Sequence, residues 1–198
     1  MTAPIKLAIF LSGRGSNFQA IYHAIHSQRL TATISVVVSD NPSAAGILFA
    51  QEHQLPTLTL SPKSFPSMTA YEAEVLAQLS AYKIDLVVLA GYMRIVGPTL
   101  LTAFANKMIN IHPSLLPKYK GLHAPRQAVA DAAIVSGCTV HYVDDTLDGG
   151  PIIAQVSVPV LADDTEDSLS ARILVEEHRL LPSVIQTLAE KRNGERSS

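Results

Sequence analysis

Cysteine, charge and long apolar runs are all scarce in this sequence. Its single cysteine, Cys138, cannot form a disulfide within the chain, so we expect a reducing, cytoplasmic setting. Charged residues make up only 16% of the chain and the formal net charge is -2 at pH 7, which leaves no basic excess for a phosphate backbone. We therefore expect no nucleic acid partner.

Signals for secretion or membrane insertion are missing as well. The first residues lack a basic segment, and the apolar run 5–11 is too short for a signal peptide. No stretch approaches the ~20 apolar residues that a membrane span needs. The 198 residues are 47% apolar, which is enough for one substantial core. Because no linker or repeat interrupts them, we expect residues 1–198 to form a single domain with a frayed polar tail at 191–198.

Apolar runs rich in β-branched residues alternate with segments of helical spacing. The expected strands, near-continuously apolar and so buried on both faces, are 5–11, 34–38, 84–89 and 108–111. The expected helices between them are 18–25, 44–50 and 71–79. This alternation predicts an α/β fold in which helices flank a mostly parallel central sheet.

The pattern changes after Gly121. Segments 137–143 and 151–160 are typical of two strands joined by the turn-rich residues 144–150, which predicts a late antiparallel or edge addition. The acids and hydroxyls of 163–167 then cap a long final helix with 168–188 as its body. Pro182 is expected to kink or divide that helix.

A glycine-rich turn, SGRGSN at 12–17, follows the first strand and opens the first helix. Glycines let the backbone approach an anion, and the free N–H groups of a helix start, with the Ser16 and Asn17 side chains, can hold a phosphate. The turn matches neither the nucleoside triphosphate loop nor the dinucleotide fingerprint. A plain strand-to-helix turn with Ser16 as N-cap explains it equally well.

Two further motifs carry candidate catalytic groups. Asn110 and His112 are two apart at the end of an expected strand, so they share a face at the edge where open α/β sheets bind ligands. An amide donor beside an imidazole can hold an oxyanion and move a proton. Asp148, before two glycines, is either part of a hairpin turn or a carboxylate that faces His112 and favours its protonated form. The residues alone leave both alternatives open.

Four motifs together resemble a known family. SGRGSN at 12–17, LAGYMRI at 89–95, NIHPSLLP at 110–117 and LDGGP at 147–151 are similar, in order and spacing, to the phosphoribosylglycinamide formyltransferases. The resemblance covers nearly the whole chain. It implies a Rossmann-like formyltransferase fold and transfer of a formyl group from 10-formyltetrahydrofolate to glycinamide ribonucleotide in purine synthesis.

The resemblance also implies roles for the three candidate catalytic residues. The amine would add to the formyl carbon, and the Asn110 amide and a protonated His112 would hold the oxyanion. Asp148 would keep His112 charged and oriented and help a water relay the proton to the folate nitrogen.

Binding residues follow from the same resemblance. The ribonucleotide phosphate would lie on Gly15, Ser16 and Asn17, and its amine on Glu177. The pterin would lie against Met93, Arg94, Ile95 and Val96, with Val143 and Asp144 closing over it. The family also implies a cis peptide at Leu116-Pro117. This sequence departs from the family at Leu174, where some members have a polar phosphate contact, and at Met68, where an arginine near the folate tail is expected.

Several related activities share the Asn-His-Asp set. A methionyl-tRNA formyltransferase would need a further C-terminal domain and a basic face, and a formyltetrahydrofolate hydrolase usually has an extra N-terminal domain. A formyltransferase acting on another phosphorylated amine, such as an amino sugar nucleotide, stays open. A silent binding domain would not need all three residues. We expect small-molecule partners, no metal because no Cys/His cluster has metal spacing, and a monomer or homodimer.

Overall fold

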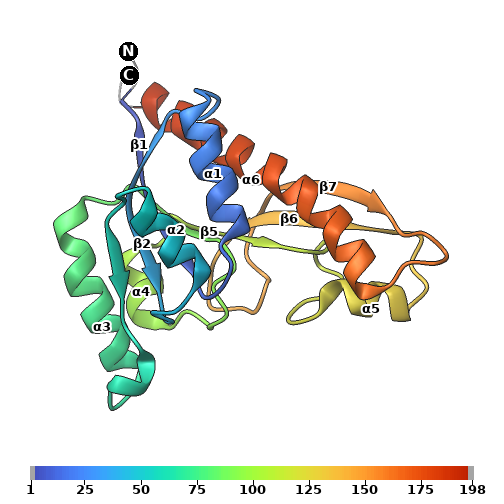
Figure 1. The fold of residues 1–198 in the computed structure, drawn as a ribbon, viewed down its shortest axis with the longest axis horizontal. Coiled ribbons are helices and arrows are strands. Elements are labelled where there is room, and N and C mark those ends of the chain that lie inside the picture. Colours follow the sequence, from blue (N-terminus) through green and yellow to red (C-terminus); the bar gives the residue numbers. More distant parts are fainter. Residues whose placement is uncertain (1–2, 196–198) are drawn as a thin grey trace.

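The computed structural model describes residues 3–195 as one seven-stranded sheet with helices on both faces (Figure 1). The strand order is β3-β2-β1-β4-β5-β6-β7. Neighbouring strands are parallel from β3 to β5, and β6 and β7 are added antiparallel. The expected mostly parallel sheet with a late antiparallel addition is confirmed. The strands are β1 Ile5–Leu11, β2 Ala32–Ser39, β3 Thr57–Thr59, β4 Leu86–Leu89, β5 Met108–His112, β6 Val135–Tyr142 and β7 Ile152–Pro159.

Alternation along β1 shows how the two faces are filled. Leu7, Ile9 and Leu11 belong to the core cluster under α1, α2 and α6. Ala8 and Phe10 belong to a second cluster on the other face, under α3 and α4. Burial of both faces is the physical reason for the near-continuous apolar runs. The helices are α1 Ser16–His26, α2 Ala45–Glu52, α3 Met68–Leu79, α4 Pro98–Ala103, α5 Ala124–Ala130 and α6 Glu166–Glu195, with short 3-10 turns η1 Pro62–Ser64 and η2 Ser80–Tyr82.

The final helix is longer than its expected body of 168–188, and of the two effects expected of Pro182, division of the helix does not occur. Helix α6 is one continuous element from Glu166 to Glu195 and is not divided at Pro182. It runs along β6 and β7 and then along α1 (Figure 1). Near its end the Arg192 guanidinium donates to the carbonyls of Ala3 and Pro4. Of the tail expected to be frayed, 191–195 are helical and 196–198 lie outside the described residues.

A third apolar cluster lies under α5 and the first half of α6. It contains Ala128, Cys138, Val158, Leu169 and Ile173. Burial raises the pKa of the Cys138 thiol to about 12, so the sulfur stays protonated and inert. The single cysteine is therefore a small core residue.

Candidate active site

The glycine-rich turn and the segment after β4 meet at the carboxyl edge of the sheet. The chain adds β2 and β3 on one side of β1 and then returns to add β4 on the other side, parallel to β1, so the order of strand addition reverses between β1 and β4. Such a switch point leaves a crevice in which α/β sheets bind ligands. Ser12 N–H donates to the Gly91 carbonyl at 3.0 Å, and residues 12–17 with 90, 91 and 93 line a hollow of about 220 Å³.

The start of α1 has the geometry of an anion-binding turn. Gly15 precedes the helix with φ 71, a left-handed conformation that favours glycine, and a Cβ there would lie 3.0 Å from the Gly46 Cα. The first intrahelical bond runs from Gln19 N–H to Gly15, so the N–H groups of Ser16 and Asn17 remain for a ligand. Ser16 is the first helical residue, and no side chain caps the helix. The reading of Ser16 as N-cap is wrong, because Gly15 occupies that position.

Helix α6 brings Glu177 to this turn. The Asn17 side-chain amide donates to Glu177 Oε2 at 2.8 Å, across 160 residues of sequence. Burial raises the pKa of Glu177, and hydrogen bonding from Asn17 partly offsets this. The Asn17 Oδ1 atom is buried and unpaired. One of the two Asn17 amide hydrogens is thus taken by Glu177, and the Asn17 backbone N–H is the donor that the helix start offers to the anion.

Asn110 is oriented by a histidine that sequence reasoning did not assign to the site. Register pairs Asn110 on β5 with His141 on β6, and Asn110 Nδ2 lies 3.2 Å from His141 Nε2. His141 Nδ1 lies 2.9 Å from the Tyr142 carbonyl, which can only accept, so the proton sits on Nδ1 and Nε2 accepts from Asn110. Burial lowers the pKa of His141 and keeps this ring neutral. Asn110 therefore retains a second amide hydrogen, which has no acceptor among residues 3–195.

His112 lies between two acceptors. Its Nε2 is 2.8 Å from the Tyr119 carbonyl, and its Nδ1 is 3.4 Å from Asp148 Oδ2. A ring that faces an acceptor with each nitrogen suits the protonated imidazolium. The Tyr119 contact also means that His112 Nε2 is already engaged by the protein's own backbone.

Asp148 reaches the two histidines from the loop between β6 and β7. It has a left-handed φ of 45, and its Oδ2 accepts from the Gly121 N–H at 2.8 Å while its Oδ1 is 3.8 Å from His141 Nε2. The carboxylate thus ties the 144–150 loop to the segment after His112. Of the two readings of this motif, the contact with His112 is the one found.

The segment after β4 presents an irregular surface. Met93 and Ile95 are 68% and 80% exposed, whereas the Val96 side chain is buried. Arg94 Nε forms a 2.6 Å ion pair with Asp40 Oδ2. Within residues 3–195, the backbone N–H and C=O groups of Arg94, Ile95 and Val96 form no hydrogen bond. These unpaired backbone donors and acceptors can form hydrogen bonds with a planar heterocyclic ligand.

Val143 and Asp144 leave β6 on the same side. Val143 N–H donates to the Met108 carbonyl at 3.0 Å, and its side chain packs against the cluster that also holds Tyr92. Hydrogen bonds from Thr146 lower the pKa of Asp144, so it is a carboxylate at neutral pH. The peptide bond between Leu116 and Pro117 is cis, as the resemblance implies.

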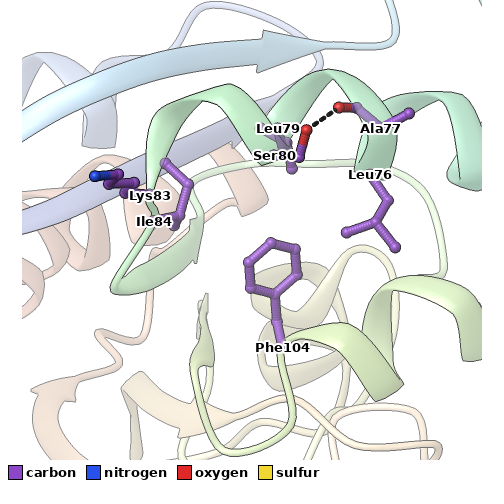
Figure 2. A pocket seen from close by; sticks show the side chains of 7 residues that line it. All are labelled: Leu76, Ala77, Leu79, Ser80, Lys83, Ile84 and Phe104. Atoms are coloured by element: carbon purple, nitrogen blue, oxygen red, sulfur yellow. Dashed lines mark hydrogen bonds between the residues drawn. The ribbon is translucent and has the colours of Figure 1, made fainter.

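A second hollow, of about 290 Å³, shares no lining residue with this site (Figure 2). The Phe104 ring faces Leu76 and Ile84 across it, and the Lys83 amine points away. The rest of its lining is mostly apolar, and its one hydroxyl, that of Ser80, donates to the Ala77 carbonyl at 2.6 Å. Within residues 3–195, no group of His, Cys, Asp and Glu side chains can hold a metal ion. The same residues contain no helix with the length and apolarity to cross a membrane.

A family match, two relatives and a solved structure all relate this chain to formyltransferases. Residues 5–185 match the formyl transferase family. The chain is 42% identical over 188 residues, 95% of its length, to phosphoribosylglycinamide formyltransferase of Escherichia coli (strain K12), of which it covers 89%. It is also 42% identical to the enzyme of that name in Bacillus subtilis (strain 168), covering 97% of this chain and 99% of the relative. The solved structure of glycinamide ribonucleotide transformylase 1 from Symbiobacterium toebii superposes with a TM-score of 0.94 at 45% identity, covering 97% of this chain and 91% of that one.

Proposed function

Because the chain belongs to the formyl transferase family, and within it to the phosphoribosylglycinamide formyltransferases, we propose that Asn110, His112 and Asp148 catalyse its formyl transfer from 10-formyltetrahydrofolate. The acceptor is the amine of glycinamide ribonucleotide, and the reaction is a step of purine synthesis. The observation that carries the catalytic assignment is the His112 ring, which lies between the Asp148 carboxylate and a backbone carbonyl, on the strand that also bears Asn110.

The amine nitrogen attacks the formyl carbon, and the carbonyl electron pair moves to oxygen. The second Asn110 amide hydrogen, left free by His141, is the donor best placed to stabilise that oxyanion. Collapse of the intermediate breaks the bond from carbon to folate nitrogen. One proton passes from the attacking amine to the folate nitrogen, through a water that Asp148 helps to hold, so the products are the formylated ribonucleotide and tetrahydrofolate.

His112 supplies positive charge beside the oxyanion. For His112 Nε2 to donate to that oxygen directly, the Tyr119 carbonyl at 2.8 Å must first give way. Asp148 balances the charge of the ring throughout, because it lies against Nδ1, on the opposite side of the imidazole.

The substrates are assigned to the two walls of the crevice. Gly15, Ser16 and Asn17 hold the ribonucleotide phosphate through helix-start N–H groups, and Glu177 receives the amine. Met93, Arg94, Ile95 and Val96 bind the pterin, with Val143 and Asp144 beside them. Helix α3 begins at Met68, an exposed, uncharged side chain where the family's arginine is expected.

We also propose that residues 1–198 act as one domain, as a monomer or homodimer, in the cytoplasm. The unbroken sheet and the core clusters shared by both ends of the chain support one domain. The buried Cys138 thiol suits a reducing compartment.

Turnover is expected only when both substrates are present. Mixing the protein with 10-formyltetrahydrofolate and glycinamide ribonucleotide should release tetrahydrofolate and formylated ribonucleotide in a 1:1 ratio, followed by absorbance and mass spectrometry. Turnover without the ribonucleotide would instead indicate hydrolysis. Turnover with an amino sugar nucleotide but not with the ribonucleotide would contradict the assigned acceptor.

Glu177→Gln is expected to make the protein more stable and less active. Burial raises the pKa of Glu177, so its contribution to stability is present below the ordinary carboxyl pKa and is lost as the pH rises through the raised value. Removing the buried charge should therefore raise the Tm at pH 8 by about 2–4 °C, the shift of roughly 1 kcal/mol in a chain of this size. The ribonucleotide KM should rise about tenfold, because the amine loses a charged partner.

The matched control is Glu176→Gln. Glu176 forms an exposed pair with Arg179 and should change neither Tm nor KM appreciably. A Glu177→Gln protein with lower Tm at pH 8 and an unchanged ribonucleotide KM would contradict the assigned role.

A further inference from the structure

The segment between β4 and α4 has no regular secondary structure to define its conformation. Residues 90–97 form neither helix nor strand, so internal hydrogen bonds do not define their backbone. Yet this is the segment whose unpaired N–H and C=O groups are assigned to the pterin. A site of this kind works only if contacts from elsewhere hold those groups in place before the ligand arrives.

Side chains from two strand ends hold the first half of the segment. Ser12, directly after β1, accepts from the Met93 N–H through its Oγ at 2.9 Å. Asp40, directly after β2, accepts from Arg94 Nε at 2.6 Å. The Asp40 carboxylate is almost completely buried, with 8% of its side chain exposed, whereas the Arg94 side chain is 37% exposed, so water screens this pair from the arginine side only.

Helix α3 holds the second half. Glu72 is 2% exposed, and its Oε1 accepts from the Gly97 N–H at 2.5 Å. Gly97 fits so closely that a Cβ there would lie 2.8 Å from Glu72 Oε2. The preceding residue, Tyr71, contacts the Tyr92 hydroxyl at 3.0 Å, and the Tyr92 ring packs edge-on against Phe10.

We propose that Ser12, Asp40 and Glu72 are positioning residues that hold residues 93–97 in the conformation that binds the pterin of the co-substrate. The inference rests on the proposed function, because that function assigns the pterin to this segment. Three side chains from three elements fix three points of one short segment and leave the backbone between them unpaired.

Of the three residues, Glu72 gives the strongest support for a positioning role. Within residues 3–195 no cation pairs with this buried carboxylate, which makes its burial costly, and an apolar side chain would pack there with less penalty. Its partner, the Gly97 N–H, belongs to the residue that ends the segment and directly precedes α4. The carboxylate therefore sets where the segment ends and the helix begins.

The test compares Glu72→Gln and Asp40→Asn with wild type. We expect the KM for 10-formyltetrahydrofolate, and the Kd of tetrahydrofolate measured by calorimetry, to rise about tenfold in each variant, the effect of losing one charge-assisted bond. The ribonucleotide KM and kcat at saturating folate should stay within about twofold. Glu52→Gln, an exposed change of the same type with no contact to the segment, is the matched control.

Formyl transfer by the wild-type protein and folate binding by the variants are separate measurements. A wild-type protein that gives no formyl transfer would contradict the proposed function, whereas tetrahydrofolate calorimetry tests the anchors without turnover. Wild-type folate affinity in both variants, at unchanged Tm, would overturn the positioning role, and so would equal rises in both KM values. If Glu72→Gln fails to fold, the result depends on Asp40→Asn. That variant should fold, because Arg94 is partly exposed and losing its ion pair with Asp40 opens no cavity in the core.

Discussion

Replacing Asp148 with asparagine is expected to lower kcat about 10³-fold, with both KM values changed by less than about fivefold. The carboxylate lies 3.4 Å from His112 Nδ1 and is the acceptor that balances a charged ring. Asparagine has nearly the same shape and accepts the left-handed φ of 45 at this position, and its oxygen can still accept from Gly121 N–H. The loss would therefore report the missing charge.

Asp145→Asn provides the control for this variant. Asp145 lies in the same loop, is exposed and touches neither histidine, so its kcat should equal that of wild type. Circular dichroism and Tm would confirm that both proteins are folded. A kcat within tenfold of wild type for Asp148→Asn would contradict the assignment of Asp148 as the partner of His112.

Replacing Asn110 with alanine is expected to lower kcat about 10²- to 10³-fold, because the oxyanion loses its amide donor. The half-buried side chain does not hold the core together, so the folate and ribonucleotide KM values should change little. Single-turnover kinetics, which isolate the chemical step from product release, are the appropriate measurement.

His141→Gln separates orientation from donation in the same experiment. His141 Nε2 accepts one Asn110 hydrogen and so fixes which way the amide points. Glutamine can accept in place of the ring but with looser geometry, and we expect a kcat about tenfold below wild type, between wild type and Asn110→Ala. Equal defects in both variants would mean that His141 itself takes part in the chemistry, and no defect would mean that Asn110 needs no partner.

The central strands could be predicted because a strand that is buried on both faces has a near-continuous run of apolar residues. Strand β1 occupies its expected bounds, Ile5–Leu11, and β5 extends only one residue beyond the expected end. Strand β3 was not predicted, since it has three residues at the sheet edge and only Leu58 is buried. Helices α4 and α5 were also missed, because each has fewer than eight residues and shows no apolar period.

From the residues alone, the shared placement of candidate site residues could be predicted only where they are close in sequence, and the family resemblance was needed to join distant ones such as Asp148 and Glu177 to them. Asn110 and His112 share a face because the side chains of a strand alternate. His141 and Asp148 join them through the register of β5 with β6 and the path of the following loop, and neither is encoded locally. The Tyr119 carbonyl beside His112 is a backbone group, so no residue type could have indicated it. Asp40 and Glu72 belong to no motif for the same reason: tertiary contacts alone bring them to the segment.

The contact between Gly15 and Gly46 bears on which substitutions this chain can accept during evolution. A Cβ at Gly46 would lie 2.7 Å from Leu11 Cδ2, and a Cβ at Gly15 would lie 3.0 Å from the Gly46 Cα. Helix α2 thus packs directly against the anion-binding turn. Gly46 lies outside every ligand-binding motif, yet a side chain there would press on Leu11 and, at 3.3 Å, on the Gly15 Cα of the phosphate site, so we expect glycine to be retained at position 46.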